Sequence, residues 1–149
     1  MNLLPIKQIS ILSAILGGIL GILTLVPYVG ILTFIVCTFA AGSIVLIYMQ
    51  KLELIGELDT KSWSIYGAIG GFVSFLGFSA TFVPLATIIG AIVKTSYYLG
   101  ISLMFRLGFF VTILMILFVA VMSALMNGFG AMTTSYVQDF YKQSKNNSN

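Results

Sequence analysis

Residues 63–106 decide the fold of this chain: WSIYGAIGGFVSFLGFSATFVPLATIIGAIVKTSYYLGISLMFR. The run from residue 63 to residue 93 is apolar and rich in glycine, is interrupted by Pro84, and is followed by Lys94. A transmembrane helix needs about 20 consecutive apolar residues, so this run is too long for one untilted helix. Whether Lys94 lies inside the bilayer or beside it therefore decides how many times the chain crosses.

Two interpretations of this stretch compete. In the first, one helix ends near Phe82 and Pro84 begins a further helix that reaches Phe105. In the second, a single proline-kinked helix reaches Val93, and residues 94–106 form an interfacial connector. A central Lys costs about 2.5–3.5 kcal/mol and each Leu, Ile, Val or Phe returns about 0.3–0.6 kcal/mol. Insertion of the disputed segment alone is therefore near neutral, and neighbouring helices must decide.

Two observations point in opposite directions. Four spans would put five of the seven basic residues on the side of the N-terminus, which mildly suits the positive-inside rule. Five spans are favoured by an internal similarity, because a Gly-Gly pair precedes both Pro27 and Pro84 and Pro27 marks a hairpin. We predict an all-α polytopic helical membrane protein of five transmembrane helices joined as antiparallel hairpins, with four as the close alternative. The five predicted spans are residues 9–26, 31–50, 63–82, 84–105 and 107–126.

The composition agrees with a chain whose solvent is lipid. Of its 149 residues 59% are hydrophobic and 7% are charged, and the mean hydropathy is +1.10, whereas soluble domains carry about 25% charged residues. We predict one bundle over residues 1–143 with no soluble domain, followed by a short polar tail at 144–149. The first span exceeds a signal-peptide core of roughly 7–15 apolar residues and lacks a small-residue cleavage site, so we expect it to be uncleaved.

The charges indicate orientation rather than a charged partner. The net charge is +3, but there is no run of Lys and Arg that would predict nucleic-acid binding. We predict a multi-pass protein of the cell membrane with a cytoplasmic N-terminus. Its expected partners are the lipid bilayer and either further copies of itself or other membrane subunits.

Small residues recur at helical spacing. Gly70, Ser74 and Gly77 are four and three residues apart, which puts them on one helical face. Little hydrophobic force acts between helices in lipid, so close backbone approach at small residues supplies much of the packing. We predict helix packing inside the bundle at these positions, with self-association through one such face as the alternative. The predicted packing residues are Gly17, Gly21, Gly67, Gly70, Gly71, Ser74, Gly77 and Gly130.

Catalytic and cofactor chemistry is poorly represented. The chain has no His and a single Cys, which removes the commonest metal and haem ligands and the usual general base. All four acidic residues lie outside the predicted spans. We therefore predict a protein that is not an enzyme and has no metal, cofactor or catalytic site. Asn127 has no catalytic companion, but it could form hydrogen bonds across helices.

Two functions remain as hypotheses. The first is a small integral membrane protein that acts by helix packing, as a structural or assembly subunit or a homo-oligomer. The alternative is a small transporter or pore for an anionic or small polar solute with Lys94 in its path, because ionisable residues within a span often mark such paths. Exposure of Lys94 to an aqueous cavity would separate the two.

Overall fold

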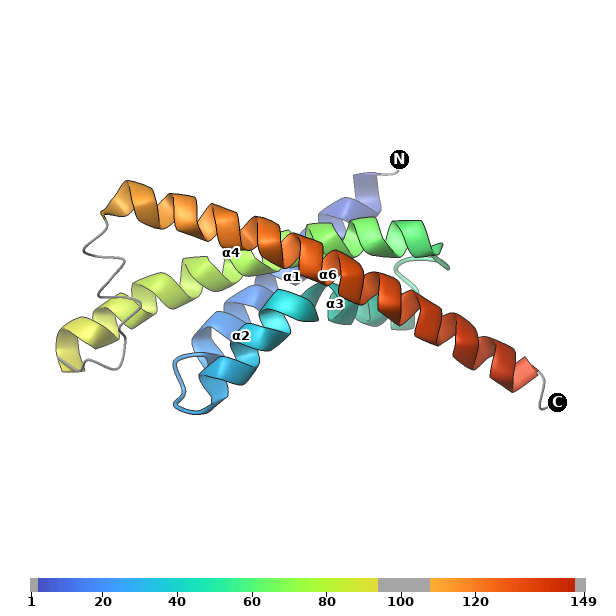
Figure 1. The fold of residues 1–149 in the computed structure, drawn as a ribbon, viewed down its shortest axis with the longest axis horizontal. Helices are drawn as coiled ribbons and strands as arrows, with labels where there is room; N and C mark the ends of the chain where they lie inside the picture. Colours follow the sequence, from blue (N-terminus) through green and yellow to red (C-terminus); the bar gives the residue numbers. More distant parts are fainter. Residues whose placement is uncertain (1–2, 94–107, 147–149) are drawn as a thin grey trace.

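The computed structural model describes residues 3–93 and 108–146, and every element within those ranges is an α-helix. The all-α prediction is therefore confirmed for this part of the chain. Figure 1 shows α4 and α6 as the longest elements, crossing over α1 near the centre of the molecule. The helices are α1 (Leu3–Leu23), α2 (Val29–Phe39), α3 (Ala41–Lys51), α4 (Thr60–Val93) and α6 (Phe109–Asn146).

Three of the described helices are long and apolar enough to cross a membrane. They contain the stretches Pro5–Leu23, Thr60–Gly90 and Phe110–Tyr141, and a fourth crossing is available if α2 and α3, bent by 70°, form one span. This is the pattern of a membrane-embedded helical protein. Three or four crossings in the described residues are fewer than the five that we predicted.

Helix α4 continues through Pro84 to Val93, so the predicted helix end near Phe82 is wrong. Proline is tolerated inside membrane helices where neighbouring hydroxyl groups and helices help to satisfy the backbone. The carbonyl that loses its helical donor at Pro84 is that of Ala80, four residues earlier. Next to the proline, Thr87 donates a side-chain hydrogen bond to the Val83 carbonyl (2.7 Å) within the same helix. The bounds of α4 match the alternative interpretation, a single helix reaching Val93. The remainder of the predicted span, including Lys94, lies outside the described residues.

Helices α1 and α4 run parallel. Along α1, Ile9 lies beside Gly70, Gly17 beside Ser74 and Gly21 beside Phe78, so the contacts on α4 advance in the same direction. Figure 1 shows the two helices with their N-terminal ends toward the same side of the molecule. Residues 24–59, which connect them, must therefore return the chain to the level at which α1 begins.

Helix α6 runs antiparallel to α4. Ser135 pairs with Thr60 through their hydroxyl groups (3.2 Å) at the start of α4, and Ser123 donates to the Gly71 carbonyl further along (3.3 Å). Both described ends of the chain consequently lie toward the same side of the bundle (Figure 1).

The described residues form two apolar clusters in the interior, one at the beginning of α4 and one near its middle. The first gathers around Trp63, which is only 1% exposed at the beginning of α4, with Ile9, Leu46 and Met49 from α1 and α3. The second joins Leu20 of α1, Cys37 of α2, Phe75 and Phe78 of α4 and Ala120 of α6. Because α3 contributes to the first cluster and α2 to the second, the α2–α3 pair connects the two clusters.

Candidate functional site

The side chain of Asn127 lies between the end of α2 and the beginning of α3, where the helix is interrupted. In an uninterrupted helix the Gly42 N–H would donate to the Thr38 carbonyl, four residues earlier. Here the Gly42 N–H donates to Asn127 Oδ1 (2.7 Å), and Asn127 Nδ2 donates to the Thr38 carbonyl (2.7 Å). A side chain inserted into the helical ladder is a known cause of a kink. The carboxamide therefore replaces one backbone hydrogen bond with two and accounts for the 70° bend.

The polar cluster around Asn127 is closed to solvent. Asn127 and its neighbour on the same face, Ser123, are both 0% exposed. Asn127 Nδ2 also lies within hydrogen-bond distance of the Cys37 carbonyl (3.1 Å) and the Ser123 carbonyl (2.9 Å). The Ser123 hydroxyl in turn lies 3.3 Å from the Gly71 carbonyl. This cluster joins α2, α3, α4 and α6, and it confirms that Asn127 forms hydrogen bonds across helices.

The α1–α4 contact depends on backbone approach at glycine. A methyl group on Gly77 would lie 2.5 Å from the Ala14 carbonyl oxygen, and one on Gly17 would overlap the Ser74 carbonyl. Ser74, which is fully buried, donates to the Ser13 carbonyl of α1 (2.9 Å). The two backbones are therefore close enough for side-chain-to-backbone hydrogen bonds to form between them.

The contacts of α6 and α3 use the remaining small residues. A methyl group on Gly67 would overlap Ala131, one on Gly71 would overlap Asn127, and one on Gly130 would lie 2.6 Å from the Phe39 carbonyl oxygen. The structure thus places the predicted packing residues at contacts between helices of the same chain. Sequence reasoning missed Gly42, which faces the Gly67 carbonyl, because no other glycine lies three or four residues from it in the sequence.

Two buried hydroxyl groups lack a hydrogen-bond partner among the described residues, those of Ser13 and Ser43. Both lie at glycine contacts, since Ser13 Oγ is 3.1 Å from the position of a methyl group on Gly70 and Ser43 Oγ is 3.6 Å from that on Gly130. They occur on separate helix contacts and form no common cluster.

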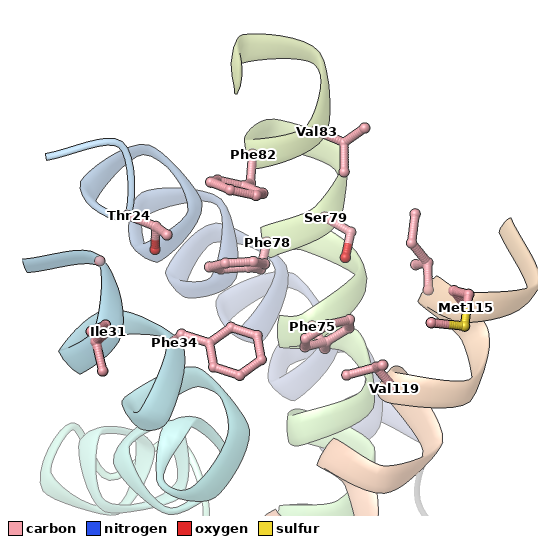
Figure 2. Close-up of a pocket in the computed structure, with 12 residues that line it drawn as sticks. Thr24, Ile31, Phe34, Phe75, Phe78, Ser79, Phe82, Val83, Met115 and Val119 are labelled. Carbon is pink, nitrogen blue, oxygen red and sulfur yellow. The ribbon is translucent and has the colours of Figure 1, made fainter. Parts of the chain in front are cut away.

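An apolar cavity of about 430 Å³ lies between α2, α4 and α6. Figure 2 shows Phe34 of α2 projecting toward Phe75 and Phe78 of α4, with Met115 and Val119 of α6 on the opposite wall. The rings are in contact: Phe34 meets Phe75 edge-on with centroids 6.3 Å apart, and Phe75 stacks on Phe78 at 5.7 Å. Phe82 extends this aromatic wall by stacking on Phe78 at 5.4 Å.

The lining offers little to a polar ligand. Of the twelve lining residues only Thr24 and Ser79 carry hydroxyl groups. The Thr24 hydroxyl donates to the Leu20 carbonyl (2.7 Å) and also contacts the Thr33 hydroxyl (2.6 Å), so it is satisfied within the protein. A buried water molecule needs two to four polar partners, which this surface does not supply. The lining of the cavity therefore suits a hydrocarbon ligand.

Lys94, the predicted solute-path residue, lies outside the described residues. Within the described ranges, no group of three or more His, Cys, Asp or Glu side chains could hold a metal ion. Outside the spans, Asp59 precedes α4, and a hydrogen bond from the Ser62 side chain is the main cause that lowers the pKa of its carboxyl group. Asp59 thus has the position and the contacts of a helix cap.

Comparison with family models, curated proteins and solved structures found no match to the chain.

Proposed function

We propose that this chain is a small multi-pass integral membrane protein that acts through helix packing, as a structural or assembly subunit or as a homo-oligomer. The observation that carries the proposal is that buried polar side chains form hydrogen bonds between helices. Ser74, Ser123 and Asn127 direct their protons to carbonyl groups of other helices. These groups join helices together, and none of them lines a cavity that could conduct a polar solute.

The topology in this proposal has four crossings, with α2 and α3 as one broken span. Each of these helices has 11 residues and is about 16 Å long. At a bend of 70° their outer ends are about 27 Å apart, close to the roughly 30 Å of a hydrocarbon core. The parallel arrangement of α1 and α4 supports a return crossing rather than a re-entrant loop. Five crossings would have required a helix end near Phe82, which α4 does not have.

Four crossings also suit the charges. The N-terminus, the connector at residues 52–59 and the C-terminus would share one side, together with Lys7, Lys51 and Lys61. By the positive-inside rule this side is cytoplasmic, in the cell membrane. The outer end of the apolar cavity would then lie in the leaflet away from the cytoplasm, because the α1–α2 turn is on that side.

The experiment measures assembly and solute flux on the same preparation. The full chain is purified in mild detergent, analysed by native mass spectrometry for stoichiometry, and reconstituted in liposomes for flux of chloride and of glycerol. We expect a defined homo-oligomer or a co-purifying membrane subunit, and liposomes no more permeable than empty ones.

Transport through Lys94 is the alternative hypothesis, and the same liposomes test it. Two results together would contradict the packing proposal. The first is solute flux that is lost in Lys94→Met and retained in the connector control Lys61→Met. The second is a chain that is monomeric and co-purifies with no partner.

A further inference from the structure

We propose that the cavity between α2, α4 and α6 binds one acyl chain of a membrane lipid, with the lipid headgroup outside it. The inference rests on the part of the proposed function that places the chain in a bilayer, and it adds a specific ligand. It is carried by the depth of the cavity, its length and its chemistry.

The depth follows from the contacts of α1. The middle of its apolar stretch, Pro5–Leu23, is near Ala14, which contacts Gly77 of α4. The α4 wall of the cavity runs from Phe75 to Val83, so it begins at about the centre of the bilayer. Eight residues of helix cover about 12 Å, and half of a hydrocarbon core is about 15 Å. The cavity therefore extends through most of one leaflet, parallel to the lipid chains.

The outer end of the cavity lies at the membrane surface. Thr24 and Gly30, on either side of the α1–α2 turn, close this end of the lining. Between them Tyr28 is fully exposed, with a positive φ of 69° that turns it away from the bundle. Tyrosine is enriched at the level of lipid headgroups. An acyl chain that occupied the cavity would therefore have its free end near the centre of the bilayer and its headgroup beside the α1–α2 turn.

The length and the chemistry of the cavity suit a hydrocarbon chain. The cavity follows about 12 Å of α4, and of its twelve lining residues only Thr24 and Ser79 carry hydroxyl groups. An acyl chain of the same leaflet runs parallel to this space and reaches a similar depth. Water is a poor occupant, because a buried water molecule needs two to four polar partners and the lining hydroxyl of Thr24 is already bonded within the protein.

The first test uses a phosphatidylcholine that carries a diazirine in one acyl chain. The lipid is titrated into the delipidated full chain in detergent micelles and photolysed, and labelled peptides are mapped by mass spectrometry. We expect labelling near Phe34 and Met115 that saturates at one lipid per chain and is competed by unlabelled phosphatidylcholine. Non-saturating label spread over exposed residues of α6 such as Phe118 would show bulk solvation only, and would overturn the proposal.

The second test narrows the cavity. Val83→Phe and Val119→Phe add rings to its α4 and α6 walls, while Ile88→Phe and Val121→Phe make the same kind of change at exposed positions outside it. We expect saturable labelling to fall at least tenfold in the first pair and to stay unchanged in the controls. Equal labelling in both pairs would overturn the proposal.

Folding and assembly are measured on the same variants. Helicity and the melting temperature identify any variant that does not fold, in which case Met115→Trp at the half-exposed rim replaces it. Stoichiometry by native mass spectrometry distinguishes the acyl-chain proposal from the packing proposal. A cavity variant that loses saturable lipid binding but assembles normally agrees with both. Absence of saturable binding in a wild-type chain that assembles normally overturns only the acyl-chain site. A separate preparation carries a diazirine analogue of methionine in place of Met115. If photolysis of that preparation cross-links position 115 to a second copy of the chain, the cavity is an interface for self-association, and the acyl-chain proposal is overturned.

Discussion

At the scale of single residues, Asn127 has the largest structural consequence. Its carboxamide is fully buried and bonds both to the last turn of α2 and to the first turn of α3. The backbone N–H of Gly42 can only donate, so it identifies the side-chain oxygen of Asn127 unambiguously. Backbone groups at a break inside a membrane cannot be satisfied by water, and the amide takes over that role.

Replacing Asn127 by Leu tests this role. Leu has a similar size but leaves the Gly42 N–H and the Thr38 carbonyl without their partners. Each buried unpaired group costs about 1–3 kcal/mol, so with two such groups we expect the free energy of unfolding to fall by about 2–6 kcal/mol. The measurement is reversible unfolding of the full chain in mixed micelles.

Met126→Leu, at the neighbouring and partly exposed position, is the control for this change and should leave the free energy of unfolding almost unaltered. A loss below about 0.5 kcal/mol in Asn127→Leu, within the usual range for an ordinary interhelical hydrogen bond, would contradict the bridging role.

At the scale of elements, the α1–α4 pair is held together at contacts where no side chain fits. Gly77 allows the Ala14 backbone to approach, and Gly17 does the same for Ser74. Elsewhere on α4 a glycine has no such contact, because among the described residues a methyl group on Gly90 would meet nothing within 4 Å. Gly77 and Gly90 therefore differ in what the described part of the structure places opposite them.

The Gly77→Leu and Gly90→Leu variants use this difference. Overpacking a close contact typically costs about 1–3 kcal/mol, so Gly77→Leu should lower the free energy of unfolding by about 3 kcal/mol. Gly90→Leu should be neutral or slightly stabilising, because Leu is a better helix former than Gly by up to about 1 kcal/mol. Thermal unfolding in detergent, followed by circular dichroism, measures both. Equal melting temperatures would remove the packing role from this face of α4.

At the scale of the whole molecule, the parallel arrangement of α1 and α4 supports the four-crossing topology that we propose. The bent α2–α3 pair carries the chain back between them, and α6 returns antiparallel to α4 (Figure 1). With the bent pair as one span, the proposal puts both described ends of the chain on one side of the membrane.

A topology assay tests this arrangement directly. Reporters active on only one side of the membrane are fused after Asn149 and inserted at Gly56 in the connector, where a methyl group would meet no described residue within 4 Å. We expect both to report the same, cytoplasmic side. Opposite sides would indicate an odd number of crossings and would return Lys94 to the bilayer as a residue worth testing for transport.

The sequence by itself determined the class of the protein. A mean hydropathy of +1.10 with 7% charged residues is incompatible with a water-facing surface, and glycine and serine at helical spacing predicted where helices would approach. These features are local, because hydropathy and helical periodicity act within a single segment.

Only the tertiary structure decided how the segments combine. Pro84 predicts a helix end when it is considered alone, yet α4 continues through it. No local signal marks a break at Ala40, because the bend depends on Asn127, 85 residues after Gly42 in the sequence. The apolar cavity likewise requires three separate helices to meet. Lipid stabilises any sufficiently apolar helix, so which helices approach, bend and leave space between them is set by contacts between segments distant in the chain.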